Sequence, residues 1–161
     1  MLFQRFLDLL NKVTRIVMVG ILLVMSFILF LQIASRFLVF MPLPWSQELL
    51  QYLNIWLVFL GAGLAVKEQG HIKIELFISI FPLSWISVFR IFSYLVSFCL
   101  VTLVALQAYE LMGKTMHSSI GALPVPMGYL YLSLVVGGAL MALNYFFLIC
   151  SEIRCFKVRE G

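Results

Sequence analysis

IVMVGILLVMSFILFLQIASRFLVF, residues 16–40, is an apolar run in which Arg36 is the single charged residue. A helix needs about 20 predominantly apolar residues to cross the hydrocarbon core of a bilayer, and this run is longer than that. A secretory signal peptide is the competing interpretation, but its apolar region has only about 7–15 residues. Because residues 16–33 already exceed that length, we expect a transmembrane helix that stays in the protein.

Three further apolar runs, residues 45–66, 83–111 and 126–150, also reach spanning length. Of the 161 residues, 63% are hydrophobic and 11% are charged, whereas soluble domains carry about a quarter charged residues. A soluble domain of this size leaves too much surface exposed to hide so many apolar side chains. The sequence therefore predicts an all-α integral membrane protein, with residues 1–161 forming one domain of four transmembrane helices.

The distribution of lysine and arginine predicts which side of the membrane each end occupies, because cytoplasmic segments carry an excess of these residues. Arg36 and Lys114 fall on one side of the predicted membrane. The other nine of the 11 fall on the opposite side: Arg5, Lys12, Arg15, Lys67, Lys73, Arg90, Arg154, Lys157 and Arg159. We therefore expect both termini in the cytoplasm.

Two segments outside the spans are expected to lie along the membrane surface. Residues 1–15 place apolar and polar side chains on opposite faces of a helix, with Asn11 and Lys12 on the polar face. This pattern predicts an interfacial helix; the alternative is that the first span extends inward by four turns. Within the link 67–82, residues 71–81 alternate like a strand, but a lone strand would leave its backbone unpaired beside a membrane. We expect a short interfacial helix ending before Pro82.

The sequence shows no group of residues suited to catalysis. The central thirds of the four spans contain no Asp, Glu, Lys, Arg or His, although ionisable groups mark the working sites of membrane transporters and enzymes. His71 and His117 fall on opposite sides of the predicted membrane, and the three cysteines lack metal-site spacing. We expect no enzymatic activity, no catalytic residue, no metal site and no cofactor. The net charge of +4 indicates contact with lipid headgroups, not nucleic acid.

The start of the second span has the features of an assembly site. Arg36 and Glu48 flank a short link with two prolines, and because charges near hydrocarbon need partners, we expect them to pair with each other or with another subunit. Trp45 fits an interfacial anchor. A polar arc of this helix can bond polar groups and comprises Gln47, Glu48, Gln51 and Asn54. The neighbouring aromatic arc can meet lipid or a protein groove and comprises Trp45, Tyr52, Trp56 and Phe59.

Polar and small residues at depth indicate contacts between helices. Interhelical hydrogen bonding is the usual role of such polar residues, which here are Gln51, Asn54, Gln107 and Asn144. Small residues let helices approach closely, although glycine is also common in membrane helices generally. The small residues are Gly61, Gly63 and Ala65 in the second span, and Ser133, Gly137, Gly138 and Ala142 in the fourth.

Five short motifs follow one another along the chain: QIASR at 32–36, PWSQEL at 44–49, GAGLA at 61–65, HI at 71–72 and LPVP at 123–126. In their order and spacing they resemble the small membrane subunit of tripartite ATP-independent periplasmic (TRAP) transporters, and the resemblance covers nearly the whole chain. One position departs from the family pattern, which often has two acids after the tryptophan. Gln47 takes the first of these places, so only Glu48 matches an acidic position.

The resemblance implies a supporting subunit in the bacterial inner membrane. In that family a large permease subunit binds substrate and sodium and moves as an elevator. A soluble periplasmic protein captures the substrate, commonly a carboxylate such as a C4-dicarboxylate or sialic acid, and the small subunit braces the large one. The implied partners are the large permease subunit, the binding protein and membrane lipids. The expected assembly residues are Arg36, Trp45, Glu48, Gln51, Asn54, Gly61 and Gly63.

Residues 37–47 and 114–125 are the segments expected to face the periplasm. Lys114, His117 and Ser118 are candidate docking residues for a binding protein; the alternative is that they are ordinary solvated connectors. Two other functions stay open for the chain as a whole. One is a free-standing tetraspan protein that regulates or assembles another membrane complex. The other is a small proton-coupled exporter, for which Glu48 at the interface is a poor substitute for an embedded carboxylate.

Overall fold

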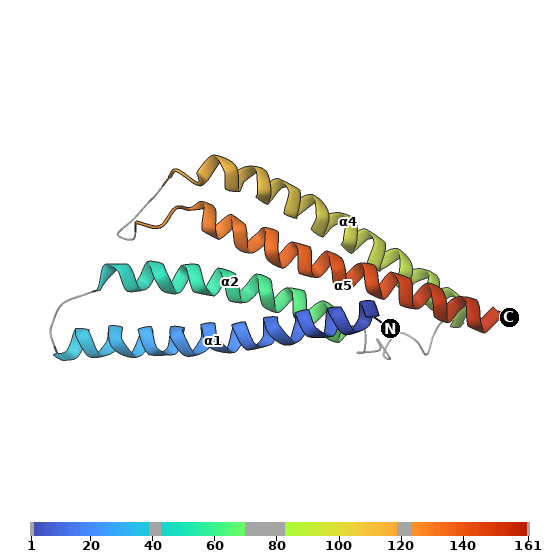
Figure 1. Ribbon diagram of the computed structural model, residues 1–161, viewed down its shortest axis with the longest axis horizontal. Coiled ribbons are helices and arrows are strands. Elements are labelled where there is room, and N and C mark those ends of the chain that lie inside the picture. The colour runs from blue at the N-terminus through green and yellow to red at the C-terminus, as the bar shows by residue number, and fades with distance from the viewer. Residues whose placement is uncertain (1, 39–42, 70–82, 119–123, 161) are drawn as a thin grey trace.

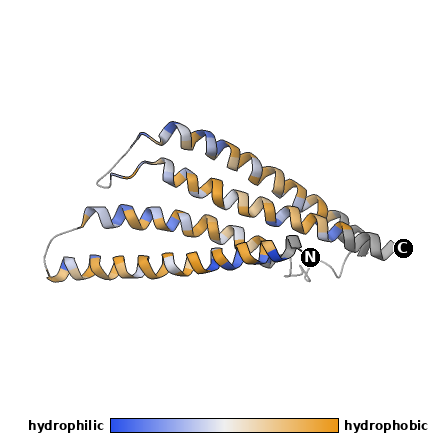
Figure 2. Cartoon of the chain, viewed as in Figure 1, coloured by the Kyte–Doolittle hydropathy of each residue, from blue (hydrophilic) through white to orange (hydrophobic). Residues whose placement is uncertain are grey.

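The computed structural model describes residues 2–38, 43–69, 83–118 and 124–160 and contains four helices, without a strand in these ranges (Figure 1). Each helix contains a segment long and apolar enough to span a membrane, and hydrophobic residues recur along all four helices (Figure 2). The predicted fold class is confirmed. The helices are α1 (Leu2–Leu38), α2 (Pro44–Gln69), α4 (Leu83–Thr115) and α5 (Gly128–Glu160).

The first helix is longer than the predicted span. It begins at Leu2 and continues without a break through residue 16, so the structure has the inward extension that was the alternative to a separate interfacial helix. The position of its first turns relative to a membrane surface stays a prediction. Of the segment 67–82, residues 67–69 complete α2, and residues 70–82 lie outside the described part of the chain.

The helices lie side by side as an open row in the order α1, α2, α5, α4 (Figure 1). The helices within each of the pairs α1–α2 and α4–α5 run in opposite directions, whereas the two central helices α2 and α5 run in the same direction. The row therefore consists of two hairpins joined through α2 and α5. Each edge helix, α1 or α4, has one closely packed neighbour.

The two edge helices pack through seams with a heptad spacing. Side chains that are buried or half-buried recur every three or four residues, the spacing that lets one helix stay in contact with another over a long distance. In α1 the seam comprises Leu7, Asn11, Thr14, Met18, Ile21, Met25, Ile28, Gln32 and Ser35. In α4 it comprises Ile91, Tyr94, Phe98, Val101, Ala105, Ala108 and Met112.

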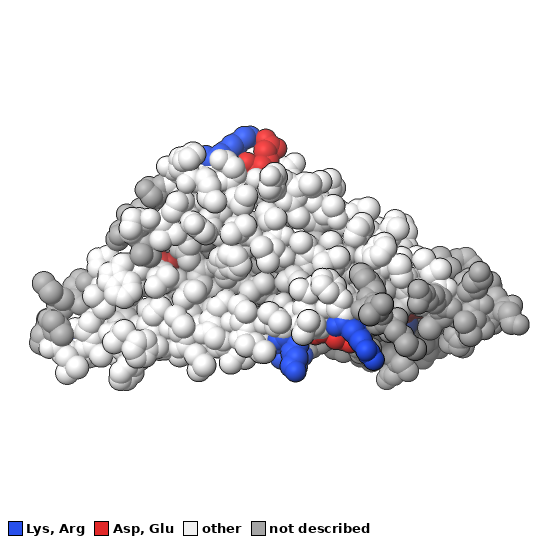
Figure 3. Space-filling model, viewed as in Figure 1, with Lys and Arg blue, Asp and Glu red and all other residues white. Residues whose placement is uncertain are grey.

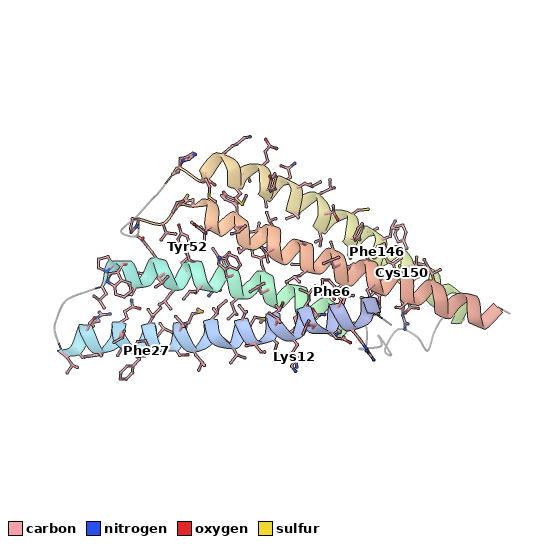
Figure 4. All side chains as sticks on the ribbon, in the orientation of Figure 1. Phe6, Lys12, Phe27, Tyr52, Phe146 and Cys150 are labelled. Atoms are coloured by element: carbon pink, nitrogen blue, oxygen red, sulfur yellow. The ribbon has the colours of Figure 1, made fainter. Side chains whose placement is uncertain are left out.

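The seam explains why α1 has no boundary near residue 15. Leu7, Asn11 and Thr14 are all buried against the neighbouring helices and extend the seam towards the N-terminus. From Ile16 onward the opposite side of α1 is exposed and apolar, and Phe27 points away from the row (Figure 4). Continuous packing on one side and apolar side chains on the other favour one uninterrupted helix.

The central pair is held at close range by glycine. A Cβ atom built on Gly137 of α5 would lie 2.6 Å from the Cβ of Phe59 and 2.7 Å from its carbonyl oxygen. Gly63 of α2 lies opposite, where an added Cβ would be 3.1 Å from the Cβ of Leu140. Glycine is required at Gly137 because the backbone of α2 occupies the space that a side chain would need.

Candidate assembly site

A buried polar cluster connects three of the four helices. The Asn11 and Asn144 side chains bond each other reciprocally, with N···O distances of 3.2 and 3.3 Å, and the Asn144 Nδ2 also donates to the Gly63 carbonyl at 2.9 Å. Both asparagines are nearly inaccessible, at 5% and 3% exposure. The interhelical bond predicted for Asn144 is confirmed. Asn11, expected on the polar face of an interfacial helix, is instead buried, and Asn144 of α5 supplies its amide with a partner.

Two ion pairs join neighbouring helices near the end of the helices at which α1 begins. Lys67 of α2 pairs with Asp8 of α1, and Arg90 of α4 donates from Nη1 to the Glu152 Oε1 of α5 at 3.2 Å. All four side chains remain partly exposed, so each pair contributes modestly to stability. Each pair joins the two helices of one hairpin.

The two predicted arcs of α2 point in unexpected directions. The aromatic arc, which was expected to meet lipid or a protein groove, lies largely within the chain. Tyr52 lies between α2 and α5 and donates from its hydroxyl to the Val125 carbonyl at 3.3 Å (Figure 4), and Phe59 packs on Gly137. Trp45, at 38% exposure, is the most open member.

The polar arc is the exposed one. Gln47, Gln51 and Asn54 are exposed, whereas Glu48 is half-buried and has an interaction partner. The hydrogen bonds expected of Gln51 and Asn54 are therefore not made to other described residues of this chain. Gln107 on α4 is exposed in the same way. Of the four polar residues predicted to form hydrogen bonds between helices, Asn144 forms them with other described helices of this chain. Gln51, Asn54 and Gln107 are exposed instead.

The remaining predicted assembly residues are divided between two helices. Arg36 is exposed near the C-terminal end of α1. It lines a shallow depression together with Gln32, Ile33 and Phe37. The ion pairs between described residues do not include Arg36 with Glu48, and the pairing of these two residues stays a prediction for the assembled state. On α2, an added Cβ on Gly61 would meet the flexible end of Met18 of α1 at 3.1 Å.

The candidate docking residues lie together at the end of α4, with Lys114 in its last turn and His117 and Ser118 just after it. Lys114, His117 and Ser118 are all exposed. The Lys114 Nζ donates to the Glu110 Oε1 one turn earlier at 2.6 Å. Basic and acidic side chains lie next to each other at the edges of the face shown in Figure 3, and most of that face is uncharged. The Ser118 carbonyl accepts from the Met127 N–H at 2.9 Å, which ties the residues after α4 to those before α5.

Residues 25–155 match the family model for the DctQ component of tripartite ATP-independent periplasmic transporters. The chain is 35% identical over 72 residues to a protein of Haemophilus influenzae described as a TRAP transporter small permease protein, a match that covers 45% of each chain. It is 30% identical over 67 residues to the sialic acid TRAP transporter small permease protein SiaQ of Vibrio cholerae, covering 42% of this chain and 39% of that protein. The chain thus spans less than half the length of the curated relatives it matches.

Proposed function

The chain belongs to the DctQ component family of TRAP transporters, and we propose that it is the small membrane subunit that braces a large permease subunit during binding-protein-dependent uptake of a carboxylate. Its family and its four spanning helices make it a multi-pass protein of the inner membrane. The family assigns it to transport, not to enzymatic catalysis. Sodium coupling and the movement of substrate belong, in this proposal, to the large subunit.

The exposure pattern of the row carries the proposal. Large apolar side chains cover the outer faces of α1 and α4, including Leu23, Phe30, Phe92 and Leu103 at 63–68% exposure. Asn11 and Asn144, buried on packed helices of the described chain, bond each other. A substrate pathway needs polar or ionisable groups that face a cavity. The arrangement instead suits a rigid platform beside another membrane protein, and the sialic acid relative supports a carboxylate as the transported solute.

We expect the purified chain to transport nothing alone. Proteoliposomes containing only this chain should take up organic acids, including sialic acid and C4-dicarboxylates, no faster than empty liposomes under an inward sodium gradient. Adding a large TRAP permease subunit and its binding protein should give uptake that collapses when the sodium gradient is removed. The control omits this chain from the full mixture. Uptake by the chain alone, or equal uptake with and without it, would contradict the proposal.

We expect Lys114 to assist docking of the binding protein. Exposed loops and helix ends held by rigid elements commonly carry recognition, and reversal of a rim charge acts mainly on the rate of association. Lys114→Glu should lower uptake by about threefold when binding protein is limiting, while the yield of the membrane complex stays unchanged. Glu110→Gln is the matched control, because it removes the partner of Lys114 and keeps the cation. Wild-type kinetics for Lys114→Glu would show that this end of α4 takes no part in docking.

A further inference from the structure

The outward side of α2 carries a polar stripe, defined here as Gln47, Gln51 and Asn54. These residues are exposed, and Val58 continues the same line at 53% exposure. The spacings of four, three and four residues place all four on one side of the helix. Within the part of the chain that the structure describes, none of the three amides has a hydrogen-bond partner.

The stripe reaches well into the spanning segment. That segment runs from Pro44 to Lys67, about 36 Å at 1.5 Å per residue, and Asn54 lies about 15 Å along it. An amide at such a depth that faces hydrocarbon loses its hydrogen bonds to water without replacement. The outward side of α2 is therefore poorly suited to lipid along its first half.

The other helices of the chain do not cover the stripe. Gly61 marks the side of α2 that meets α1, through Met18, and Gly63 marks the side that meets α5, through Leu140. The Gly63 contact lies on the opposite side of the helix from the stripe. Gly61 lies seven residues after Asn54, so the end of the Met18 side chain of α1 reaches the line of the stripe beyond Val58. The three amides and Val58 are exposed, so α1 does not cover them. The edge helices contrast with α2, because their exposed sides are dominated by Leu, Val and Phe, which lipid solvates well.

We infer that the polar stripe of α2 is the face that docks the large permease subunit, and that the opposing transmembrane helix presents hydroxyl or amide side chains to it. This inference rests on the proposed function. A partner helix that is wholly apolar would leave the amides as unsatisfied as lipid does, whereas hydroxyl and amide groups both donate and accept. Val58, one turn deeper than Asn54, would form the apolar end of this contact.

The first test compares two sets of amide-to-leucine changes in the co-expressed complex. Gln51→Leu with Asn54→Leu should lower the amount of large subunit that co-purifies by about tenfold, equivalent to about 1.4 kcal/mol. Gln107→Leu is the matched control, because Gln107 is an exposed amide on the edge helix α4. Expression and the thermal midpoint of the variant chain alone should match wild type, since leucine suits an exposed position in lipid.

The second test places a photocrosslinking amino acid at Val58 or at Val104, exposed valines of α2 and α4. Position 58 should give an adduct with the large subunit at least fivefold more abundant than position 104. An adduct of two copies of this chain at position 58, or wild-type complex yield for Gln51→Leu with Asn54→Leu, would overturn the inference. If the wild-type chain does not bring down any permease, the proposed function fails instead.

Discussion

Replacement of Gly137 by alanine is expected to loosen the contact between α2 and α5 and with it the joint between the two hairpins. The new Cβ would lie 2.6–2.8 Å from the Cβ, carbonyl oxygen and carbonyl carbon of Phe59. Two of these are backbone atoms that cannot move aside without shifting α2. Extra methyl groups in packed interiors destabilise by about 1–3 kcal/mol, and Gly137→Leu should have a larger effect because its side chain cannot be accommodated at all.

Thermal unfolding of the detergent-solubilised chain, followed by size-exclusion chromatography of the fraction that stays monodisperse, measures this effect. Gly20→Ala is the control, because nothing lies within 4 Å of the position that its Cβ would take and alanine favours a helix more than glycine does. Gly20→Ala should leave the midpoint unchanged or raise it slightly. Equal midpoints for Gly137→Ala and Gly20→Ala would show that the central pair is not as close as described.

Replacement of Asn144 by leucine is expected to have the second large effect. It removes both hydrogen bonds of the Asn11 side chain and the donor to the Gly63 carbonyl. The buried Asn11 amide is then left unsatisfied. Such a loss costs about 1–3 kcal/mol, although bonds between membrane helices are often at the low end of that range. Because three helices meet at this cluster, the cost should appear in the stability of the whole row.

A double-mutant cycle with Asn11→Leu separates the pair from its surroundings. The double variant should be less destabilised than the sum of the single variants, since it leaves no orphaned amide. Ser133→Ala is the control, because the buried Ser133 hydroxyl bonds only its own helix, at the Leu130 carbonyl. Strict additivity in the cycle, or an Asn144→Leu variant as stable as Ser133→Ala, would contradict the role assigned to the cluster.

The four helices of spanning length in the described part of the chain could be predicted from the sequence, because a bilayer imposes a length and a composition on whatever crosses it. Their arrangement could not. In a soluble protein the apolar side of a helix faces the core, but in lipid both the packed side and the outer side are apolar, so periodicity does not distinguish them. The aromatic arc of α2 illustrates this, since Tyr52 and Phe59 suit lipid and a neighbouring helix equally well.

The assembly site could also be predicted only in part. Asn144 stood out because a polar residue at depth needs a partner, but its partner Asn11 was hidden in a segment whose polar residues also fit a water-facing side. The small residues of the second and fourth spans pointed to close packing. The sequence alone, however, gave no reason to expect a closer helix contact at Gly137 than at Gly61. The structure separates them: the neighbour of Gly61 is the movable end of Met18, and that of Gly137 is backbone.

The central position of α5 has a consequence for the biosynthesis of the protein. Of the four described helices, α5 leaves the ribosome last, and it is the helix on which α4 packs and to which α2 is joined. Until it enters the bilayer, α2 must keep its inner side in lipid, and α4 lacks its main neighbour. Insertion of α5 is therefore the step that joins the separate membrane segments into one packed row. A chain truncated before Gly128 would hold a hairpin and a solitary helix, with the asparagine cluster and the ion pair of Arg90 both unformed.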